Sequence, residues 1–132
     1  MIYILDTNII SYIIKNRDFS LIDKFETIAK EHKIGVSSIT VAELYYGVKK
    51  RGSQKLDALV SEFLLPLERY PFDENAAFEY GNIRSTLEYK GNTIGPNDLF
   101  IAAHTKSLNA VLVTNNVKEF ERVENLSLEN WV

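Results

Sequence analysis

Short, continuous apolar runs alternate along this chain with longer stretches in which apolar residues recur every three or four positions. The continuous runs at residues 2–5, 34–37 and 110–113 are typical of strands buried on both faces of a parallel sheet. Residues 69–72 form a further candidate strand, and residues 126–132 a candidate edge strand with Trp131 packed against the sheet. This alternation predicts a three-layer α/β fold, in which helices flank a mostly parallel sheet.

Helical spacing and capping signals predict the elements of the first half of the chain. A helix is expected at about residues 8–15, and Ser20 is expected to cap the next one. Thr40 and Glu43 match a T-x-x-E capping box, and Gly52 is a stop signal for the helix that follows. A second apolar stripe, at residues 56–64 and closed by Pro66, predicts a partner helix, so the two helices are expected to form a hairpin.

The second half carries similar signals. Asp73 is expected to cap a long helix that ends near residue 89, and residues 91–96 form a loop. The next helix is expected to open at Asn97 or Asp98 and to end near residue 107. A single helical turn is predicted at residues 116–120.

Length and composition fit one domain covering residues 1–132, because 132 residues with 45% apolar content can bury a core without covalent staples. The absence of Cys excludes disulfides and thiolate metal sites. The first apolar run is interrupted at Asp6, so neither a signal peptide nor a membrane span is predicted. We expect a soluble, cytoplasmic protein that does not contact membranes.

The net charge of -3 does not decide whether the partner is nucleic acid, because bound metal would offset several of the acidic side chains. The local distribution is more informative. The basic residues Lys49, Lys50, Arg51 and Lys55 cluster after the predicted helix that carries Glu43, and Lys15 and Arg17 follow the Asp6 segment. Two interpretations stay open: a phosphate-binding surface, or a solvated helix end whose cations complement the helix dipole.

Oxygen-bearing side chains stand at the ends of the predicted strands or in the helices that follow. Asp6 follows the first strand, Glu43 lies after the second, and Asp98 opens a later helix. Thr114 and Asn116 follow the last continuous apolar run. Because the carboxyl ends of parallel strands lie along one edge of a sheet, these groups are expected to meet there.

Carboxylate and neutral oxygens are the ligands that Mg²⁺ and Mn²⁺ prefer. Three carboxylates at one site are sufficient for phosphodiester hydrolysis by a metal-activated water, without a protein nucleophile. Each acid alone is better explained by local structure, as a helix cap or as a favourable charge at a helix N-terminus, than as a metal ligand. Only the joint placement of these acids favours a metal site. His32 and His104 lack a partner motif, and the chain has no Gly-rich phosphate loop.

Five segments resemble, in order, the PIN-domain toxins of bacterial VapBC toxin–antitoxin modules. They are D-T-N at residues 6–8, S-I-T-V-A-E-L-Y-Y-G at 38–47, I-R with K-G at 83–84 and 90–91, G-P-N-D-L-F-I-A-A-H at 95–104, and V-T-N-N-V-K-E-F at 113–120. Each motif alone is loose, but five in register are specific. The resemblance covers essentially the whole chain, from the first strand to Trp131.

This resemblance implies a Mg²⁺-dependent endoribonuclease, with Mn²⁺ able to substitute, that cuts structured RNA such as tRNA or rRNA and inhibits translation. It also implies inhibition by a VapB-type antitoxin and a homodimer, with the hairpin at residues 40–65 forming a groove for an antitoxin helix. The metal-binding acids of the family fall on Asp6, Glu43 and Asp98. The supporting positions are Thr7, Asn8 and Thr114.

At one position the sequence departs from the family pattern. The fourth acidic position after the Thr-Asn pair is here Asn116, which leaves less charge for a second metal. Glu119 lies three residues on, on the same helical face, and can supply the missing charge. RNA contacts are expected at Lys49, Lys50, Arg51 and Arg84, with the alternative that Arg84 holds a carboxylate of the site.

Two other functions compete with this interpretation. A phosphotransfer enzyme of the haloacid-dehalogenase or receiver type also places an Asp after its first strand, but the former would need a second acid where this chain has Asn8. A non-catalytic, PIN-like module that binds RNA or protein would be expected to lose metal ligands. The presence of Asp6, Glu43 and Asp98 together favours the enzyme.

Overall fold

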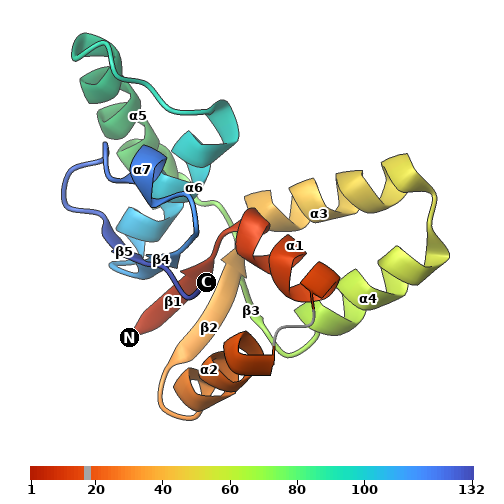
Figure 1. Ribbon diagram of the computed structural model, residues 1–132. Helices are drawn as coiled ribbons and strands as arrows, with labels where there is room; N and C mark the ends of the chain where they lie inside the picture. Colours follow the sequence, from red (N-terminus) through yellow and green to blue (C-terminus); the bar gives the residue numbers. More distant parts are fainter. Residues whose placement is uncertain (17–18) are drawn as a thin grey trace.

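A five-stranded parallel sheet forms the centre of the computed structural model, which describes residues 1–16 and 19–132 (Figure 1). Arg17, one of the basic residues noted above, lies outside the described residues. The strand order is β3-β2-β1-β4-β5. The strands are β1 (Ile2–Leu5), β2 (Lys33–Ser37), β3 (Glu68–Tyr70), β4 (Val111–Val113) and β5 (Ser127–Glu129).

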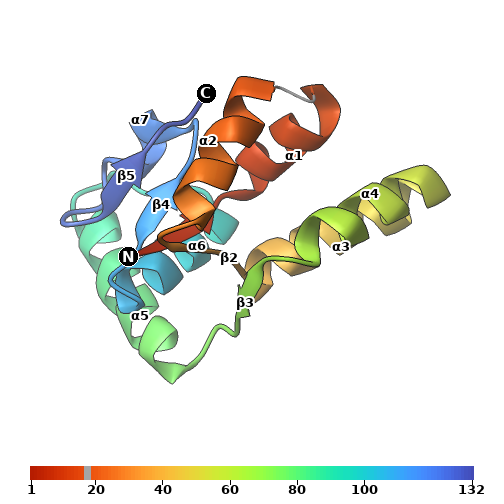
Figure 2. The same ribbon diagram turned by 90° about the horizontal axis from the view of Figure 1, so that it is seen from below.

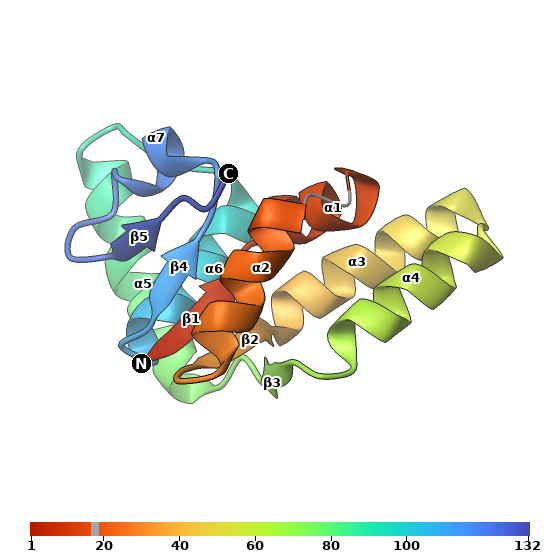
Figure 3. The same ribbon diagram turned by 60° about the horizontal axis from the view of Figure 1, so that its bottom comes forward.

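Helices cover both faces of the sheet and confirm the three-layer α/β prediction (Figure 2). The helices are α1 (Thr7–Asn16), α2 (Phe19–Ala29), α3 (Ser38–Arg51), α4 (Gln54–Leu64), α5 (Glu74–Tyr89), α6 (Pro96–Ser107) and α7 (Val117–Phe120). Figure 3 shows α3 and α4 side by side as a hairpin that projects from the sheet. In the described part of the chain, no helix is long and apolar enough to cross a membrane.

The sheet separates two apolar cores because successive side chains of a strand point to opposite faces. In β1, Ile4 packs with residues of α5 and α6, whereas Leu5 packs with residues of α1 to α4. Trp131 is buried in the second of these cores, so the prediction for the C-terminal segment is confirmed. The central strands therefore read as continuous apolar runs.

Strand β1 lies between β2 and β4. The chain first adds β2 and β3 on one side of β1 and later adds β4 and β5 on the other side. Ligands of such sheets bind in the crevice beyond the carboxyl ends of the strands at this point. Asp6 follows β1 directly, and its backbone N–H donates to Val113 O at 2.9 Å across the junction with β4. Thr114 follows β4. The topology thus brings two of the predicted site residues together.

The capping box predicted at Thr40 is wrong. Helix α3 begins at Ser38, and its cap is Ser37, whose Oγ accepts from the Ile39 N–H at 3.1 Å. No loop separates β2 from α3, so the last residue of the strand is the one placed to cap the helix. Thr40 is consequently buried within the helix, and the carboxylate of Glu43 is available for other contacts.

Several other element ends differ from the predictions by one to three residues. Helix α1 begins at Thr7, α2 begins at Phe19 with Ser20 inside it, and β3 begins and ends slightly earlier than predicted. Helix α6 begins at Pro96, whose fixed φ suits the first helical position. The stop signal at Gly52 is confirmed, because this residue takes φ of 61° in the left-handed region.

Candidate active site

Asp6 is the most deeply buried acid of the site, with 3% of its surface exposed. One carboxylate oxygen accepts from the Thr7 N–H at 2.8 Å, and the other accepts from Thr114 Oγ1 at 2.9 Å. Burial raises the pKa of Asp6, the two hydrogen bonds oppose this rise, and the charges of Glu43 and Glu119 add to it. Residues that follow β1 and β4 therefore fix this carboxylate at the edge of the sheet.

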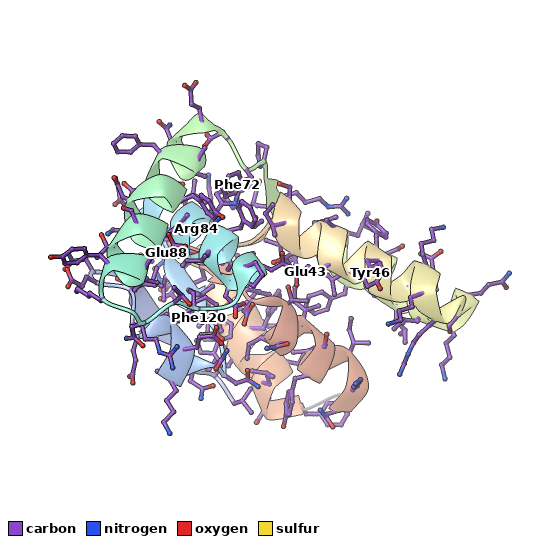
Figure 4. The ribbon with its side chains drawn as sticks, turned by 90° about the horizontal axis from the view of Figure 1, so that it is seen from above. Glu43, Tyr46, Phe72, Arg84, Glu88 and Phe120 are labelled. Atoms are coloured by element: carbon purple, nitrogen blue, oxygen red, sulfur yellow. The ribbon has the colours of Figure 1, made fainter. Side chains whose placement is uncertain are left out.

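Glu43 reaches the same place from α3, where α1, α3 and α6 meet (Figure 4). Its Oε1 accepts from Thr7 Oγ1 at 2.8 Å, and its Oε2 accepts from Asn97 Nδ2 at 3.1 Å. Thr7 Oγ1 also lies 3.3 Å from Thr40 Oγ1. The side chain of Glu43 is thus held from two sides by residues of two other helices.

Asp98 and Glu119 form a second pair of acids beside the first. Burial raises the pKa of Asp98 to about 7, and the nearby charges of Glu119 and Asp6 contribute to the rise. Glu119 Oε1 accepts from the Gly95 N–H at 2.6 Å, and Oε2 accepts from Asn116 Nδ2 at 2.7 Å. The hydrogen bond from Gly95, followed by that from Asn116, lowers the pKa of Glu119, so a proton shared by the pair resides on Asp98.

Gly95 makes this close arrangement possible. A Cβ atom at this position would lie 3.3 Å from Asp98 Oδ2 and 3.5 Å from Glu119 Oε1. The first of these distances is tighter than ordinary van der Waals contact, so a Cβ here would require the Asp98 carboxylate to shift by a few tenths of an ångström, whereas the second is an ordinary contact. A glycine therefore allows the loop before α6 to approach the pair and to donate its N–H.

Among the described residues, no cationic side chain forms an ion pair with any of the four acids, although the charge of Arg122 contributes to lowering the pKa of Glu119. Among residues 1–16 and 19–132, the ion pairs are Arg84 with Glu88 and Lys90 with Glu124, and neither belongs to this cluster. The same residues contain no group of three His, Cys, Asp or Glu side chains already arranged as a metal site. Mg²⁺ is nevertheless bound typically through one or two carboxylates, with water and substrate phosphate completing its shell. The donor set therefore fits a hard divalent cation.

Most of the predicted site residues come together in the structure. Asp6, Glu43, Asp98 and Glu119 interact electrostatically, and Thr7, Thr114 and Asn116 donate hydrogen bonds to them or to one another. Asn8 is exposed on α1, and none of the hydrogen bonds found among the described residues of the cluster involves its side chain.

Arg84 does not hold a carboxylate of the site, so that alternative is wrong. Its Nε donates to Glu88 at 3.2 Å, and its Nη1 donates to the Tyr80 hydroxyl at 2.9 Å, all within α5. Figure 4 shows Arg84 and Glu88 together on α5, apart from Glu43 on α3. Residues four apart share one face of a helix, which explains this local pairing.

A groove of about 530 Å³ adjoins the acidic cluster between α1 and the α3–α4 hairpin. Thr7 and Glu43 line it at the acidic end. Lys15, Lys50 and Arg51 supply cations, and its remaining lining residues are Ser11, Ile14, Leu44, Gly47, Leu56 and Val60. Lys50 and Arg51 of the predicted basic cluster therefore face the same groove as Glu43, whereas Lys49 is exposed outside this lining.

Asn97 and Gly95 were missed as site residues by the sequence reasoning. Two signals were available, because both lie within three residues of Asp98 and inside the segment 95–104 that carries the family resemblance. Asn97 sits in the first turn of α6, where Asn is not a strong helix former, and this gave a weak indication of another role.

Comparisons with known proteins agree with this fold and site. The PIN domain family matches residues 3–126. Ribonuclease VapC2 of Rickettsia felis is 48% identical over 136 residues, which cover 99% of this chain and 98% of that protein. The tRNA(fMet)-specific endonuclease VapC of Salmonella typhimurium is 38% identical, with coverage of 98% and 97%.

Comparison with solved structures also finds VapC proteins. The structure of VapBC2 from Rickettsia felis, bound to a DNA fragment from its promoter, superposes with a TM-score of 0.94 at 46% identity, and the match covers 100% of both chains. A match of this extent excludes the phosphotransfer alternatives. This chain therefore belongs to the PIN-domain family, within its group of VapC ribonucleases from VapBC toxin–antitoxin modules.

Proposed function

We propose that this ribonuclease is a Mg²⁺-dependent endoribonuclease that hydrolyses phosphodiester bonds in structured RNA. The observation that carries the proposal is the convergence of Asp6, Glu43, Asp98 and Glu119 at the carboxyl edge of the sheet, where none of the four forms an ion pair with the described residues. Mutual repulsion of this kind is relieved when a divalent cation binds. Mn²⁺ is expected to substitute, because it prefers the same oxygen ligands.

Asp6, Glu43 and Asp98 would hold the metal, and Glu119 and Asn116 would lie next to them. When bound, the metal would lower the pKa of a water molecule and offset charge on the phosphate. The protein supplies orientation: Thr114 and the backbone of Thr7 fix Asp6, and the Thr7 hydroxyl fixes Glu43.

We propose that the substrate is tRNA or rRNA and that its cleavage inhibits translation in the cytoplasm. The Salmonella relative acts on tRNA(fMet), which favours tRNA. Lys15, Lys50 and Arg51 line the groove that ends at Glu43, so phosphates of a bound RNA can be neutralised on the way to the acids. Lys49 adds a further exposed cation on the same helix end.

We also propose that a VapB-type antitoxin occupies this groove. The structurally similar proteins are VapBC complexes, and the groove continues as an apolar surface along α1 and α4 that includes Ile13, Leu59 and Phe63. An amphipathic segment of the antitoxin would bury its apolar face there. A small reading frame immediately upstream, encoding a DNA-binding segment and such a tail, would support this assignment.

A homodimer is the proposed oligomeric state. Phe100 of α6 stacks on Tyr80 of α5 with ring centroids 4.5 Å apart, and it lines a hollow with Ile39 and Tyr46 of α3. Tyr46 is 65% exposed, so an aromatic surface is left uncovered beside the acidic cluster. Surfaces of this kind mark sites of protein association. Sedimentation of the purified protein tests this state.

A tRNA cleavage assay tests the proposal as a whole. The purified protein is incubated with total tRNA in Mg²⁺, in Mn²⁺ and with a chelator, and Asp6→Asn is compared with Asp23→Asn, which changes an exposed Asp of α2. We expect cleavage only with metal, its loss in Asp6→Asn and its retention in Asp23→Asn. Full activity of Asp6→Asn would refute the metal assignment, and metal-independent RNA binding without cleavage would favour a non-catalytic module.

A further inference from the structure

Asn97 contacts the acidic cluster through its side chain, and the capping of α6 does not require this contact. Its Nδ2 donates to Glu43 Oε2 at 3.1 Å, across 54 residues of sequence. The opposite carboxylate oxygen of Glu43 accepts from Thr7 Oγ1 at 2.8 Å. The carboxylate is therefore held between α1 and α6, the helices on either side of it.

The helix itself does not require an Asn at this position. The N-cap of α6 is Gly95, which makes no side-chain capping bond, and Pro96 fills the first helical position. Asn97 comes second, where its amide does not cap the helix, and the residue is exposed. An exposed Asn within a helix is mildly unfavourable relative to Ala, so local structure does not explain it.

We propose that Asn97 is a positioning residue that fixes the orientation of Glu43 for metal binding, an inference that rests on the proposed function. Each carboxylate oxygen has two lone pairs, so one hydrogen bond to each leaves one lone pair on each for a cation. A Glu side chain loses considerable rotamer freedom when it is ordered. The bonds from Thr7 and Asn97 impose that order before the cation arrives.

The position of Asn97 also links two acids. It immediately precedes Asp98 in α6, and Glu43 belongs to α3, so the Asn97–Glu43 bond fixes the first turn of α6 relative to the helix that carries the other acid. Residues that orient metal ligands in this way typically change metal affinity or activity on the order of 10-fold to 100-fold when they are replaced.

The test measures Mn²⁺ binding by calorimetry and RNA cleavage in four proteins: the unmodified chain, Asn97→Ala, Glu43→Ala and the double variant. We expect Asn97→Ala to weaken Mn²⁺ binding to the RNA-free protein on the order of 10-fold. Its kcat should fall while KM for RNA stays unchanged. In the Glu43→Ala background, Asn97→Ala should have no further effect on Mn²⁺ binding, because the group it orients is gone.

Asn82→Ala is the matched control, since it removes an exposed Asn from α5 and should leave Mn²⁺ binding and cleavage unchanged. Asn97 also borders the hollow formed with Tyr46 and Phe100, so direct contact with RNA is the rival role. A raised KM with unchanged Mn²⁺ affinity would establish that rival. Equal weakening of Mn²⁺ binding in both backgrounds, or none in either, would also overturn the positioning role.

The two proposals fail in different ways. If the unmodified chain neither binds Mn²⁺ nor cleaves RNA, the proposed function itself is wrong, and if Glu43→Ala binds Mn²⁺ and cleaves RNA as the unmodified chain does, Glu43 is not a metal ligand. If Glu43→Ala is impaired and Asn97→Ala is not, only the positioning role is wrong.

Discussion

Asp98 ionises in the presence of three neighbouring carboxylates, and this gives the metal-free protein a specific pH dependence. Its pKa is about 7 in the folded chain and near 3.8 when exposed, so the folded state binds more protons than the unfolded state between about pH 4 and 7. The free energy of unfolding therefore decreases as the pH rises through this window. Burial and raised pKa at Asp6 act in the same direction.

Asp98→Asn should remove most of this dependence. We expect the variant, in chelator-treated buffer, to match the unmodified protein near pH 4 and to unfold at a higher temperature at pH 7.5, because the neutral amide does not repel its neighbours. Added Mn²⁺ should stabilise the unmodified protein and have little effect on the variant. Thermal unfolding at several pH values measures both effects. Asp23→Asn is the control, and a variant less stable than the unmodified protein at pH 7.5 would show that Asp98 is structural.

Asn116 determines how much charge is available to a second cation. It donates to Glu119 at 2.7 Å, so an Asp at this position would face a carboxylate at short range. We expect one tightly bound Mn²⁺ in the unmodified protein, because a second cation about 4 Å away needs more negative charge to offset repulsion. Calorimetric titration with Mn²⁺ should show a second tight site in Asn116→Asp and weaker Mn²⁺ binding in Glu119→Gln. An RNA cleavage assay should show slower cleavage by Glu119→Gln. Two tight sites in the unmodified protein would contradict this prediction.

At the scale of elements, the junction between β2 and α3 determines where Glu43 points. Ser37 ends the strand and caps the helix, and its buried Oγ lies 2.7 Å from Nδ1 of His104 in α6. This contact joins the elements that carry Glu43 and Asp98. The burial of His104 lowers its pKa, so the ring is neutral and its nitrogen needs the serine as a partner.

Ser37→Ala should therefore lower the free energy of unfolding by more than the loss of an ordinary helix cap does. Ser53→Ala is a suitable comparison, because Ser53 caps α4 with a single bond to the Leu56 N–H at 3.1 Å. We expect Ser53→Ala to lower the free energy of unfolding by about 1 kcal/mol. Ser37→Ala should lower the free energy of unfolding by roughly a further 1 to 3 kcal/mol, since a buried nitrogen of His104 loses its hydrogen-bond partner. Urea denaturation measures both, and equal losses would show that the contact with His104 contributes nothing.

The elements that could be predicted from the sequence were those with a regular pattern of apolar residues or with a capping residue at the helix N-terminus. Buried parallel strands give continuous apolar runs, and Asp73 caps α5 as expected, with its Oδ1 accepting from the Ala76 N–H. The capping box failed because Thr40 and Glu43 match a local pattern whose side chains are recruited by Thr7 and Asn97 from other elements. Sequence spacing does not show such contacts, which arise only when α1, α3 and α6 pack together.

Part of the candidate site was predictable for a related reason. Parallel topology brings every strand's carboxyl end to one edge, so Asp6 after β1 and Thr114 after β4 could be expected to meet without knowledge of the packing. Asp98 is a different case, because it opens a helix that follows α5 and not a strand. The bond between Gly95 and Glu119 could not be expected, because it depends on the path of the loop before α6.

At the scale of the whole molecule, two groups of basic residues line hollows at opposite edges of the sheet, one beside the acids and one next to the N-terminus. Lys50 and Arg51 line the groove, whereas Lys30 and Lys33 line a cavity next to the N-terminus. Only the first group lies on the proposed RNA path. We therefore expect the position of these cations, and not the net charge of -3, to determine where the phosphates of an RNA would bind.

Replacing Lys49, Lys50 and Arg51 with Ala should weaken RNA binding and reduce its salt dependence. Each lost phosphate contact lowers the slope of log affinity against log salt by roughly 0.7 to 0.9. The double variant Lys30→Ala and Lys33→Ala is the control and should leave the slope unchanged. Filter binding of tRNA across a salt series measures both, and an unchanged slope in the triple variant would place the RNA path elsewhere.

The same groove is the proposed docking site of the antitoxin, and Gly47 provides a way to close it without disturbing the fold. A Cβ at Gly47 would have no atom within 4 Å, although Leu44 and Leu56 line the groove around it. Gly47→Leu should therefore place a side chain into the space that the antitoxin needs. It should also stabilise α3, because Gly is about 1 kcal/mol less favourable than a strong helix former.

Gly81→Leu is the matched control, since Gly81 lies within α5 and a Cβ there also has no atom within 4 Å. Both variants should unfold at slightly higher temperature than the unmodified protein. Only Gly47→Leu should bind a cognate VapB-type antitoxin less tightly, on the order of 10-fold or more, because a crowded interface costs about 1 to 3 kcal/mol. Calorimetric titration of that protein into each variant decides the matter. Unchanged affinity in Gly47→Leu would mean that the antitoxin binds another surface and that the groove serves RNA alone.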